Sequence, residues 1–257
     1  MDSRLSIEEI HRVWTYRLRE RVPIQYILGL ASWYDFELRV GDGVLIPRPE
    51  TEVLLDLSLA ALKANASLGR HPWLDLGTGS GALAIGMALH GRNESSLPVR
   101  VKAVEASPDA MAYARENVAR YDLGETIDLV EGSWFDPFAE GDIRFGGIVS
   151  NPPYVKRGDM GDLQAEVRLH EPHSALCAVG PSPDGMDDLL SIVSRAPSYL
   201  VGGGFIGLET GGADQANALR DEMAGTERGR GEWRDVRVVP DLRGVDRFLV
   251  ATRKGGE

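Results

Sequence analysis

The sequence predicts an α/β fold in which a seven-stranded, mostly parallel sheet carries helices on both faces. Between residues 73 and 252, short apolar runs alternate with glycine-rich loops and segments of helical periodicity. Such alternation is typical of parallel strands joined by crossover helices. The last two runs are joined only by Asp241–Asp246, which is too short for a crossover helix. We therefore expect these two strands to pair antiparallel, with the final strand as the antiparallel one.

The elements of this sheet follow from the same alternation. The predicted strands are Trp73–Leu76, Val99–Glu105, Ile127–Glu131, Phe145–Ser150, Gly204–Glu209, Trp233–Pro240 and Arg247–Thr252. The predicted helices between them are Ala82–His90, Pro108–Tyr121, Asp187–Ser194 and Ala213–Ala224.

A short helix is expected at the start of the chain. Ser6 and Glu9 form a capping-box pattern, and the amphipathic segment that follows runs to about Arg21. Pro23 then stops the helix because proline lacks the backbone N–H that a helix interior requires. Residues 1–28 are therefore interpreted as an N-terminal helical segment.

A β-hairpin is expected next, over residues 29–46. Trp33–Val40 alternate between polar and apolar side chains like a strand, and Gly41–Gly43 would turn the chain back into Val44–Ile46. The segment Pro47–Thr51 then leads into a helix from Glu52 to about residue 65. Residues 47–257 are expected to form one domain.

The composition excludes several classes of function. The formal net charge of −11 repels polyanions, so no direct nucleic-acid partner is expected. The single cysteine, Cys177, excludes a disulfide within the chain and a cysteine-rich metal site. No apolar run reaches the roughly eighteen residues of a membrane span, so no membrane partner is expected.

A glycine-rich loop follows the first predicted strand and opens the next helix. Gly77, Gly79 and Gly81 allow a tight turn and let a ligand approach the backbone closely. The spacing of Gly77, Gly79 and Ala82 also fits the dinucleotide-binding fingerprint, so the loop alone does not identify its ligand. Asp75 precedes the glycines, and a buried acid suits a cofactor with an ammonium group, such as S-adenosylmethionine, better than a pyrophosphate.

Two further residues stand at strand ends close to this loop. Glu105 ends the second predicted strand, where a carboxylate can accept hydrogen bonds from both ribose hydroxyls, although it also fits a solvated strand-end acid. Trp134 follows the third predicted strand and could cover an adenine ring, whereas an isolated aromatic residue is more often part of a core.

Asn151-Pro-Pro-Tyr154 follows the fourth predicted strand and is the most informative segment. The asparagine offers a side-chain carbonyl, and the two prolines stiffen the turn and leave the carbonyl of Pro152 free to accept. Tyr154 supplies a flat face for stacking. Such a pocket suits a planar –NH2 group of an amide or a nucleobase.

Five segments carry a resemblance to a known family. They are Leu45-Ile-Pro-Arg-Pro-Glu-Thr-Glu52, Asp75–Gly81, Gly132-Ser-Trp-Phe135, Val149-Ser-Asn-Pro-Pro-Tyr154 and Glu166–Pro172. With them the chain resembles the class I, Rossmann-like S-adenosylmethionine-dependent methyltransferases. More narrowly, it is similar to the protein-(glutamine-N5) methyltransferases that modify the Gly-Gly-Gln motif of peptide chain release factors.

The resemblance implies a set of site residues. The cofactor would contact Gly77, Thr78, Gly79, Ser80, Gly81, Glu105, Trp134 and Asn151. The substrate glutamine would be held by Asn151, Pro152, Pro153 and Tyr154. Asn151 Oδ1 and the Pro152 carbonyl would accept the two amide N–H groups, and Tyr154 would pack on the amide plane. Asn151, Pro152 and Tyr154 are therefore the expected catalytic residues.

The chain departs from the family pattern in two respects. Glu105 stands where the family usually has aspartate, and only about one helix precedes the hairpin where the family usually has a helical bundle. Residues 1–28 are thus interpreted as a remnant of that bundle. The wording of the motifs is closest to cyanobacterial or plastid members, so a location in the cytoplasm, or in the plastid stroma if a transit peptide has been removed, is expected. A monomer is also expected.

Three other functions compete with this interpretation. An adenine-N6 methyltransferase shares the Asn151–Tyr154 motif, a ribosomal-protein glutamine methyltransferase shares most of the pattern, and a non-catalytic binding module could retain the fold. A metal site at His170 and His173 is not expected, because Pro172 disfavours a shared helical face and no third ligand is evident. Residues Pro47–Glu50 fit either the mouth of the substrate pocket or a rigid linker.

Overall fold

The computed structural model describes residues 6–95, 98–141, 143–178, 180–225 and 232–255. The helices are α1 (Ile7–Glu20), α2 (Ile24–Leu28), α3 (Glu52–Ala64), α4 (Ala82–Ser95), α5 (Pro108–Arg120), α6 (Ala165–His170), α7 (Asp187–Arg195) and α8 (Ala213–Gly225). Short 3-10 turns are η1 (Pro49–Thr51), η2 (Ala66–Arg70), η3 (Arg157–Asp162), η4 (His173–Ala175) and η5 (Ala196–Ser198).

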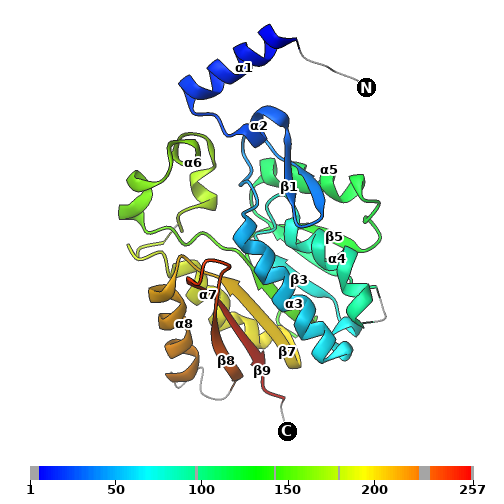
Figure 1. The fold of residues 1–257 in the computed structure, drawn as a ribbon. Helices are drawn as coiled ribbons and strands as arrows, with labels where there is room; N and C mark the ends of the chain where they lie inside the picture. Colours follow the sequence, from blue (N-terminus) through cyan, green and yellow to red (C-terminus); the bar gives the residue numbers. More distant parts are fainter. Residues whose placement is uncertain (1–5, 96–97, 142, 179, 226–231, 256–257) are drawn as a thin grey trace.

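The centre of the molecule is a seven-stranded sheet in the order β5-β4-β3-β6-β7-β9-β8 (Figure 1). Its strands are β3 (Trp73–Leu76), β4 (Val101–Glu105), β5 (Ile127–Glu131), β6 (Phe145–Ser150), β7 (Leu200–Glu209), β8 (Trp233–Pro240) and β9 (Asp246–Arg253). All neighbouring pairs from β5 to β7 are parallel, and β9 runs antiparallel to both β7 and β8. The predicted sheet and its antiparallel final strand are confirmed.

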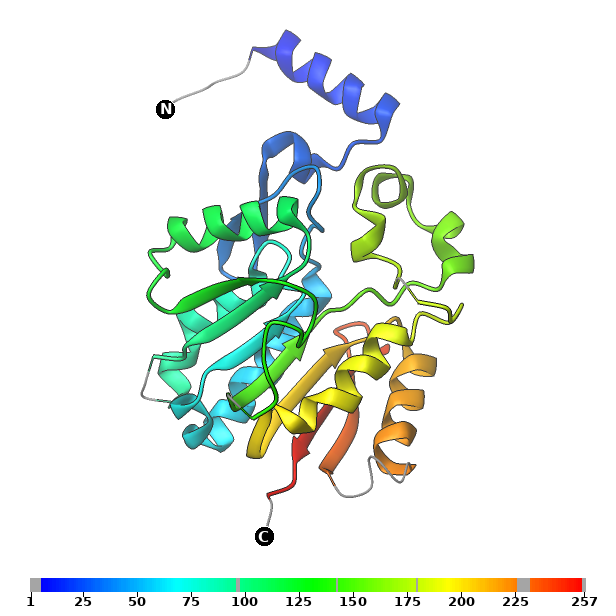
Figure 2. The same ribbon diagram turned by 180° about the vertical axis from the view of Figure 1, so that it is seen from behind.

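Helices cover both faces of the sheet, and each face has its own apolar core. Side chains alternate across a strand, so in β9 Phe248 and Val250 enter the core with α3 and α4, while Leu249 and Ala251 enter the core with α7 and α8. Figure 1 shows α3 in front of the sheet, and Figure 2 shows α7 in front of it from the opposite side.

The N-terminal helix α1 begins as predicted. Ser6 accepts a hydrogen bond from the backbone N–H of Glu9, and the Glu9 carboxylate accepts one from the N–H of Ser6. None of the residues of α1 is buried, and the helix projects from the body of the molecule (Figure 1). Residues 1–5 of the predicted N-terminal segment lie outside the described residues.

The predicted hairpin forms, but both of its strands lie earlier in the sequence than expected. Its strands are β1 (Leu30–Trp33) and β2 (Phe36–Arg39), with Trp33 opposite Phe36. Trp33 and Phe36 are both buried, so the apolar pattern changes parity between them. The prediction treated Trp33–Val40 as one strand and missed this change. Tyr34, with a φ of 54°, makes the turn, and residues 44–46 follow as an irregular segment.

Among the described residues, no helix has both the length and the apolar character needed to cross a membrane.

Gly146 in β6 offers a test of how tightly the sheet packs on η2. A β-carbon at Gly146 would collide with the backbone carbonyl of Leu68. We expect Gly146→Ala to lower the free energy of unfolding by about 2 kcal/mol or more, because backbone cannot move aside as a side chain can. Gly158→Ala is the matched control, since a β-carbon there meets no atom of the described residues within 4 Å. Equal urea midpoints for the two variants would contradict this packing.

Candidate active site

A cavity of about 570 Å³ lies where the chain reverses its winding direction along the sheet. The chain passes from β3 outward to β4 and β5, then returns to β6 on the other side of β3. The carboxyl ends of β3, β4 and β6 therefore diverge around a crevice, which is where open α/β sheets bind ligands. Most of the lining residues come from the carboxyl ends of β3, β4, β5 and β6 and from the segments that follow them. Helix α7 and two further segments complete the lining with Asp188, Ser191, Gly43, Leu45, Pro172, Ser174 and Ala175.

The glycine-rich loop after β3 forms the floor of this cavity. Gly77 and Thr78 donate backbone hydrogen bonds to the carbonyl of Val104, which fixes the loop to β4. Gly77 has a φ of 72°, and a β-carbon there would stand 3.4 Å from the Trp134 ring. Gly77 and Gly79 line the cavity, whereas the predicted residues Thr78 and Ser80 are buried in the body of the loop.

Asp75 lies beneath the loop and braces it. One carboxylate oxygen accepts hydrogen bonds from Thr78 Oγ1 at 2.6 Å and from the backbone N–H of Ala84 at 3.2 Å. The other oxygen is buried and has no hydrogen-bond partner among the described residues. Burial raises the pKa of Asp75 to about 7, against the two hydrogen bonds that lower it, and the charge of Glu105 raises it further. Asp75 is not among the residues that line the cavity.

Glu105 and Trp134 form the walls on the β4 and β5 side. Glu105 accepts backbone hydrogen bonds from Gly79 and from Ser107, each at 2.8 Å, so its carboxylate spans the two loops. Trp134 has a φ of 46°, a strained value for a non-glycine residue and one that often occurs at functional sites. Its indole N–H donates to Asp188 at 3.0 Å. The sequence reasoning missed Asp188, which lies in the first turn of α7 and also lines the cavity.

Asn151 lies in the wall between this cavity and a second one of about 470 Å³. Pro153 lines the first cavity, whereas Pro152 and Tyr154 line the second. The Asn151 side-chain amide donates to Thr51 Oγ1 at 3.2 Å. Asn151 therefore lies between the cavity that the glycine loop lines and the cavity that Pro152 and Tyr154 line.

The second cavity carries several charged side chains. Arg48, Glu50, Glu209, Arg243 and Arg247 all line it, so part of the Pro47–Glu50 segment lies at its wall. Glu50 and Arg243 form an ion pair at 3.1 Å.

The buried Glu171 connects two segments that contribute residues to this cavity. It pairs with Arg48 at 2.8 Å and accepts the backbone N–H of Ile46 at 3.1 Å. These contacts fix the segment after α6 to the segment before α3.

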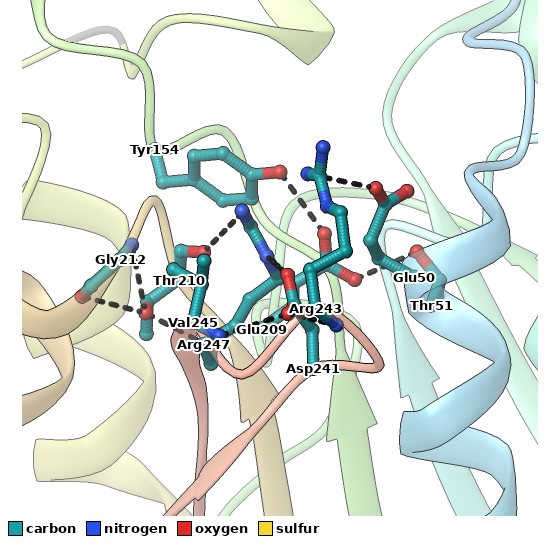
Figure 3. Close-up of polar contacts among 10 residues, drawn as sticks. All are labelled: Glu50, Thr51, Tyr154, Glu209, Thr210, Gly212, Asp241, Arg243, Val245 and Arg247. Atoms are coloured by element: carbon teal, nitrogen blue, oxygen red, sulfur yellow. Dashed lines mark hydrogen bonds and ion pairs between the residues drawn. The ribbon is translucent and has the colours of Figure 1, made fainter.

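A buried carboxylate, Glu209, links Tyr154 to the start of α3 (Figure 3). Tyr154 donates its hydroxyl to one Glu209 oxygen at 3.0 Å, and Thr51 donates to the other at 2.6 Å. Burial raises the pKa of both Glu209 and Tyr154, and the nearby Arg247 lowers both. Sequence reasoning missed Glu209, although it ends strand β7 as Glu105 ends β4.

His170 and His173 both form hydrogen bonds with backbone carbonyl groups. His170 contacts the carbonyl of Glu20 at 2.7 Å, and His173 contacts that of Arg168 at 2.9 Å. Among the described residues, no three His, Cys, Asp or Glu side chains are grouped so as to hold a metal ion.

Comparison with known proteins finds a consistent group of relatives. Residues 53–179 match the family model of the methyltransferase small domain. The release factor glutamine methyltransferase of Thermosynechococcus vestitus is 39% identical over 249 residues, covering 96% of this chain and 80% of that protein. The enzyme of the same name from Neisseria gonorrhoeae is 40% identical over 228 residues, covering 89% of this chain and 76% of that protein.

Solved structures share the fold at much lower identity. A methyltransferase from Pyrococcus furiosus superposes with a TM-score of 0.57 at 20% identity, covering 95% of this chain and 99% of that one. The N-terminal domain of human METTL16, in complex with SAH, gives a TM-score of 0.55 at 15% identity, covering 91% and 79%. These similarities confirm the predicted Rossmann-like fold.

The raised pKa of Asp75 predicts a pH-dependent stability. The folded protein binds this proton up to about pH 7, whereas an unfolded aspartate releases it near pH 4, so the free energy of unfolding falls as pH rises between these values. Asp75→Asn keeps an acceptor for Thr78 and removes the titration. Between pH 5 and pH 7 the wild type should lose on the order of 2 kcal/mol relative to this variant. Urea unfolding at each pH, with Asp159→Asn as an exposed control, measures the difference; parallel curves would contradict it.

Proposed function

Because the chain belongs to the release factor glutamine methyltransferase family, we propose that it methylates the side-chain amide nitrogen of a glutamine in a peptide chain release factor. The target glutamine is the one in the Gly-Gly-Gln motif, and the methyl donor is S-adenosylmethionine. The position of Asn151 carries this proposal, since it lies between a cavity floored by the glycine loop and a cavity lined by Tyr154. A donor and an acceptor in these two cavities meet at Asn151.

The first cavity fits the cofactor in size and chemistry. Its volume of about 570 Å³ is within the range of roughly 300–1,000 Å³ that holds ligands of this size. The backbone of Gly77 and Gly79 is accessible in it, Glu105 can accept from ribose hydroxyls, and Trp134 offers a ring face to adenine. When bound, S-adenosylmethionine supplies an electrophilic methyl group on a sulfonium sulfur.

The second cavity would position the glutamine amide. Its nitrogen is a poor nucleophile because its lone pair is delocalised into the carbonyl. Asn151 Oδ1 and the Pro152 carbonyl would accept the two N–H groups, which aims the lone pair at the methyl carbon and favours positive charge on nitrogen. As the N–C bond forms the S–C bond breaks, and the nitrogen then releases one proton to water. No strong general base is required, because the methylated nitrogen is acidic.

The competing functions receive less support. The same acceptors would suit the amino group of adenine, but the net charge of −11 opposes a polyanionic substrate. The relatives that cover most of this chain carry the name release factor glutamine methyltransferase, which favours neither a nucleic-acid nor a ribosomal-protein substrate.

Label transfer tests the proposed substrate and atom together. The protein is incubated with tritiated S-adenosylmethionine and a release factor, its Gly-Gly-Gln→Gly-Gly-Ala variant, a ribosomal protein, or DNA. We expect label in the wild-type factor and none in the variant. Label found only in the ribosomal protein or in DNA would assign the chain to the corresponding alternative. A complete lack of label with intact cofactor binding would support a binding module.

Asn151→Ala tests the residue between the cavities. Loss of its oxygen removes one acceptor for the substrate amide, so turnover should fall at least about 100-fold. The dissociation constant for S-adenosylhomocysteine should change only a few-fold, because most of that cavity is lined by other residues. Single-turnover kinetics and calorimetry measure the two effects, and near-normal turnover would exclude the proposed role.

Glu105→Gln tests the cofactor cavity and has a matched control. Glutamine keeps the shape of glutamate but has only one acceptor oxygen and no charge. It therefore cannot accept hydrogen bonds from the backbone N–H groups of Gly79 and Ser107 and from the ribose hydroxyls together. We expect the dissociation constant for S-adenosylmethionine to rise by about 10- to 100-fold. Glu131 pairs with Glu105 in the sheet register but is exposed and bound to Arg115. Glu131→Gln should leave the affinity unchanged in calorimetry, and equal affinities for both variants would contradict the role of Glu105.

A further inference from the structure

We propose that Glu209, acting through the hydroxyl of Thr51, fixes the amide of Asn151 so that only its oxygen is available to the substrate. Glu209 and Thr51 are then positioning residues that select a substrate amide over a carboxylate. The inference rests on the proposed function, because it concerns the same two cavities. It adds the residues that determine how the side-chain amide of Asn151 is oriented.

The three side chains form one continuous chain of hydrogen bonds. Asn151 Nδ2 lies 3.2 Å from Thr51 Oγ1, which in turn lies 2.6 Å from Glu209 Oε2. Thr51 is 4% exposed and Glu209 is 1% exposed, so water does not compete for these bonds. Figure 3 shows the Glu209 carboxylate between the Thr51 and Tyr154 hydroxyls. These residues come from the start of α3, the end of β6 and the end of β7, which are far apart in sequence.

The direction of these hydrogen bonds follows from the Glu209 carboxylate at one end of the series. An ionised carboxylate carries no hydrogen, so the single hydrogen of the Thr51 hydroxyl must point to Glu209. The Thr51 oxygen is then left only as an acceptor, and it must receive an N–H from Asn151. The Asn151 amide therefore has its nitrogen toward Thr51 and its oxygen on the other side. A rotated amide would place two acceptors together and leave a buried group unsatisfied.

Two hydroxyl groups and a guanidinium group surround the Glu209 carboxylate. Tyr154 donates to its second oxygen at 3.0 Å. Arg247, held by Asp241 at 3.0 Å and by the carbonyl of Thr210 at 3.3 Å, places a positive charge beside the cluster. Burial raises the pKa of Glu209 above its usual value and the charge of Glu50 adds to this, whereas the hydrogen bonds from Thr51 and Tyr154 and the charge of Arg247 oppose the rise. Each carboxylate oxygen has a hydroxyl directed at it, and this geometry suits a Glu209 that only accepts hydrogen bonds.

A fixed acceptor at Asn151 has a consequence for specificity. A glutamine amide can donate N–H to Asn151 Oδ1, but a glutamate carboxylate cannot and would be repelled by it. If the Asn151 amide were free to rotate, its N–H groups could face the cavity and donate hydrogen bonds to a carboxylate. We call the series of hydrogen bonds from Glu209 through Thr51 to Asn151 the relay. The relay predicts that the protein discriminates between Gly-Gly-Gln and Gly-Gly-Glu, and that this discrimination depends on Thr51.

Three substitutions, at Thr51 just before α3 and at Ser58 within it, test the relay. Thr51→Val is close in shape but has no hydroxyl, and Thr51→Ser retains the hydroxyl. Ser58→Ala removes another buried hydroxyl, which donates to the Leu54 carbonyl. We expect Thr51→Val to lower kcat about 10- to 100-fold with little change in S-adenosylhomocysteine affinity. Thr51→Ser should recover most of the turnover. Ser58→Ala should lower the melting temperature but leave kcat unchanged.

The selectivity readout separates positioning from a structural role. A Gly-Gly-Glu release factor should inhibit the Thr51→Val protein at least several-fold more strongly than the wild type. Unchanged kcat and unchanged inhibition in a folded Thr51→Val protein would overturn the proposal, since Thr51 would then act only on stability, as Ser58 does.

An NMR measurement tests the relay without any substrate. The Asn151 side-chain ¹H–¹⁵N signals, identified by their loss in Asn151→Ala, should exchange slowly with water in the wild type and in Thr51→Ser. They should exchange at least about 10-fold faster in Thr51→Val and Glu209→Gln. Protected signals together with absent label transfer would contradict the proposed function but support the relay. Equal exchange in all variants would overturn the relay, whatever the activity.

Discussion

The parallel pairing of β3 with β4 on one side and β6 on the other is the constraint on which the site depends. Trp73 to Leu76 of β3 are buried on both faces, and every residue of β6 is buried, so neither strand can shift its register without exposing apolar side chains. This register aligns Leu76 with both Val104 and Ser150. The loop after β3, the acid ending β4 and the segment after β6 therefore emerge at the same level.

Four carboxylates, of which Asp75, Glu171 and Glu209 are buried and Glu105 is partly exposed, then convert this alignment into fixed loops. Asp75 braces the glycine loop, Glu105 joins it to the loop after β4, Glu171 joins the segment after α6 to the segment before α3, and Glu209 joins β6 to α3. Burial of a charged group is costly unless hydrogen bonds compensate it. These groups do receive such bonds, and the resulting rigidity keeps Asn151 between the two cavities. Preorganisation of this kind supports catalysis by positioning.

Much of the fold could be predicted from the sequence because its signals are local. Alternating apolar runs and glycine loops mark the strands and helices, and the five residues between β8 and β9 require an antiparallel pair. The hairpin was misplaced because Trp33 and Phe36 both face inward across a two-residue turn, and such a change of parity is easily read as one continuous strand. Glu209 and Asp188 were missed because their importance depends on which residues they contact across the fold. The roles of the predicted site residues remain proposals, although the structure places Gly77, Glu105, Trp134 and Asn151 around one cavity.

The central claim is that Asn151 accepts an N–H of a glutamine amide held beside the methyl donor. A crystal structure of the protein with S-adenosylhomocysteine and a Gly-Gly-Gln peptide tests it most directly. The account predicts the cofactor product against Glu105 and Trp134, the glutamine in the cavity of Tyr154, and its amide nitrogen within hydrogen-bond distance of Asn151 Oδ1 and the Pro152 carbonyl. A glutamine bound elsewhere, or one whose amide nitrogen makes neither contact, would contradict it.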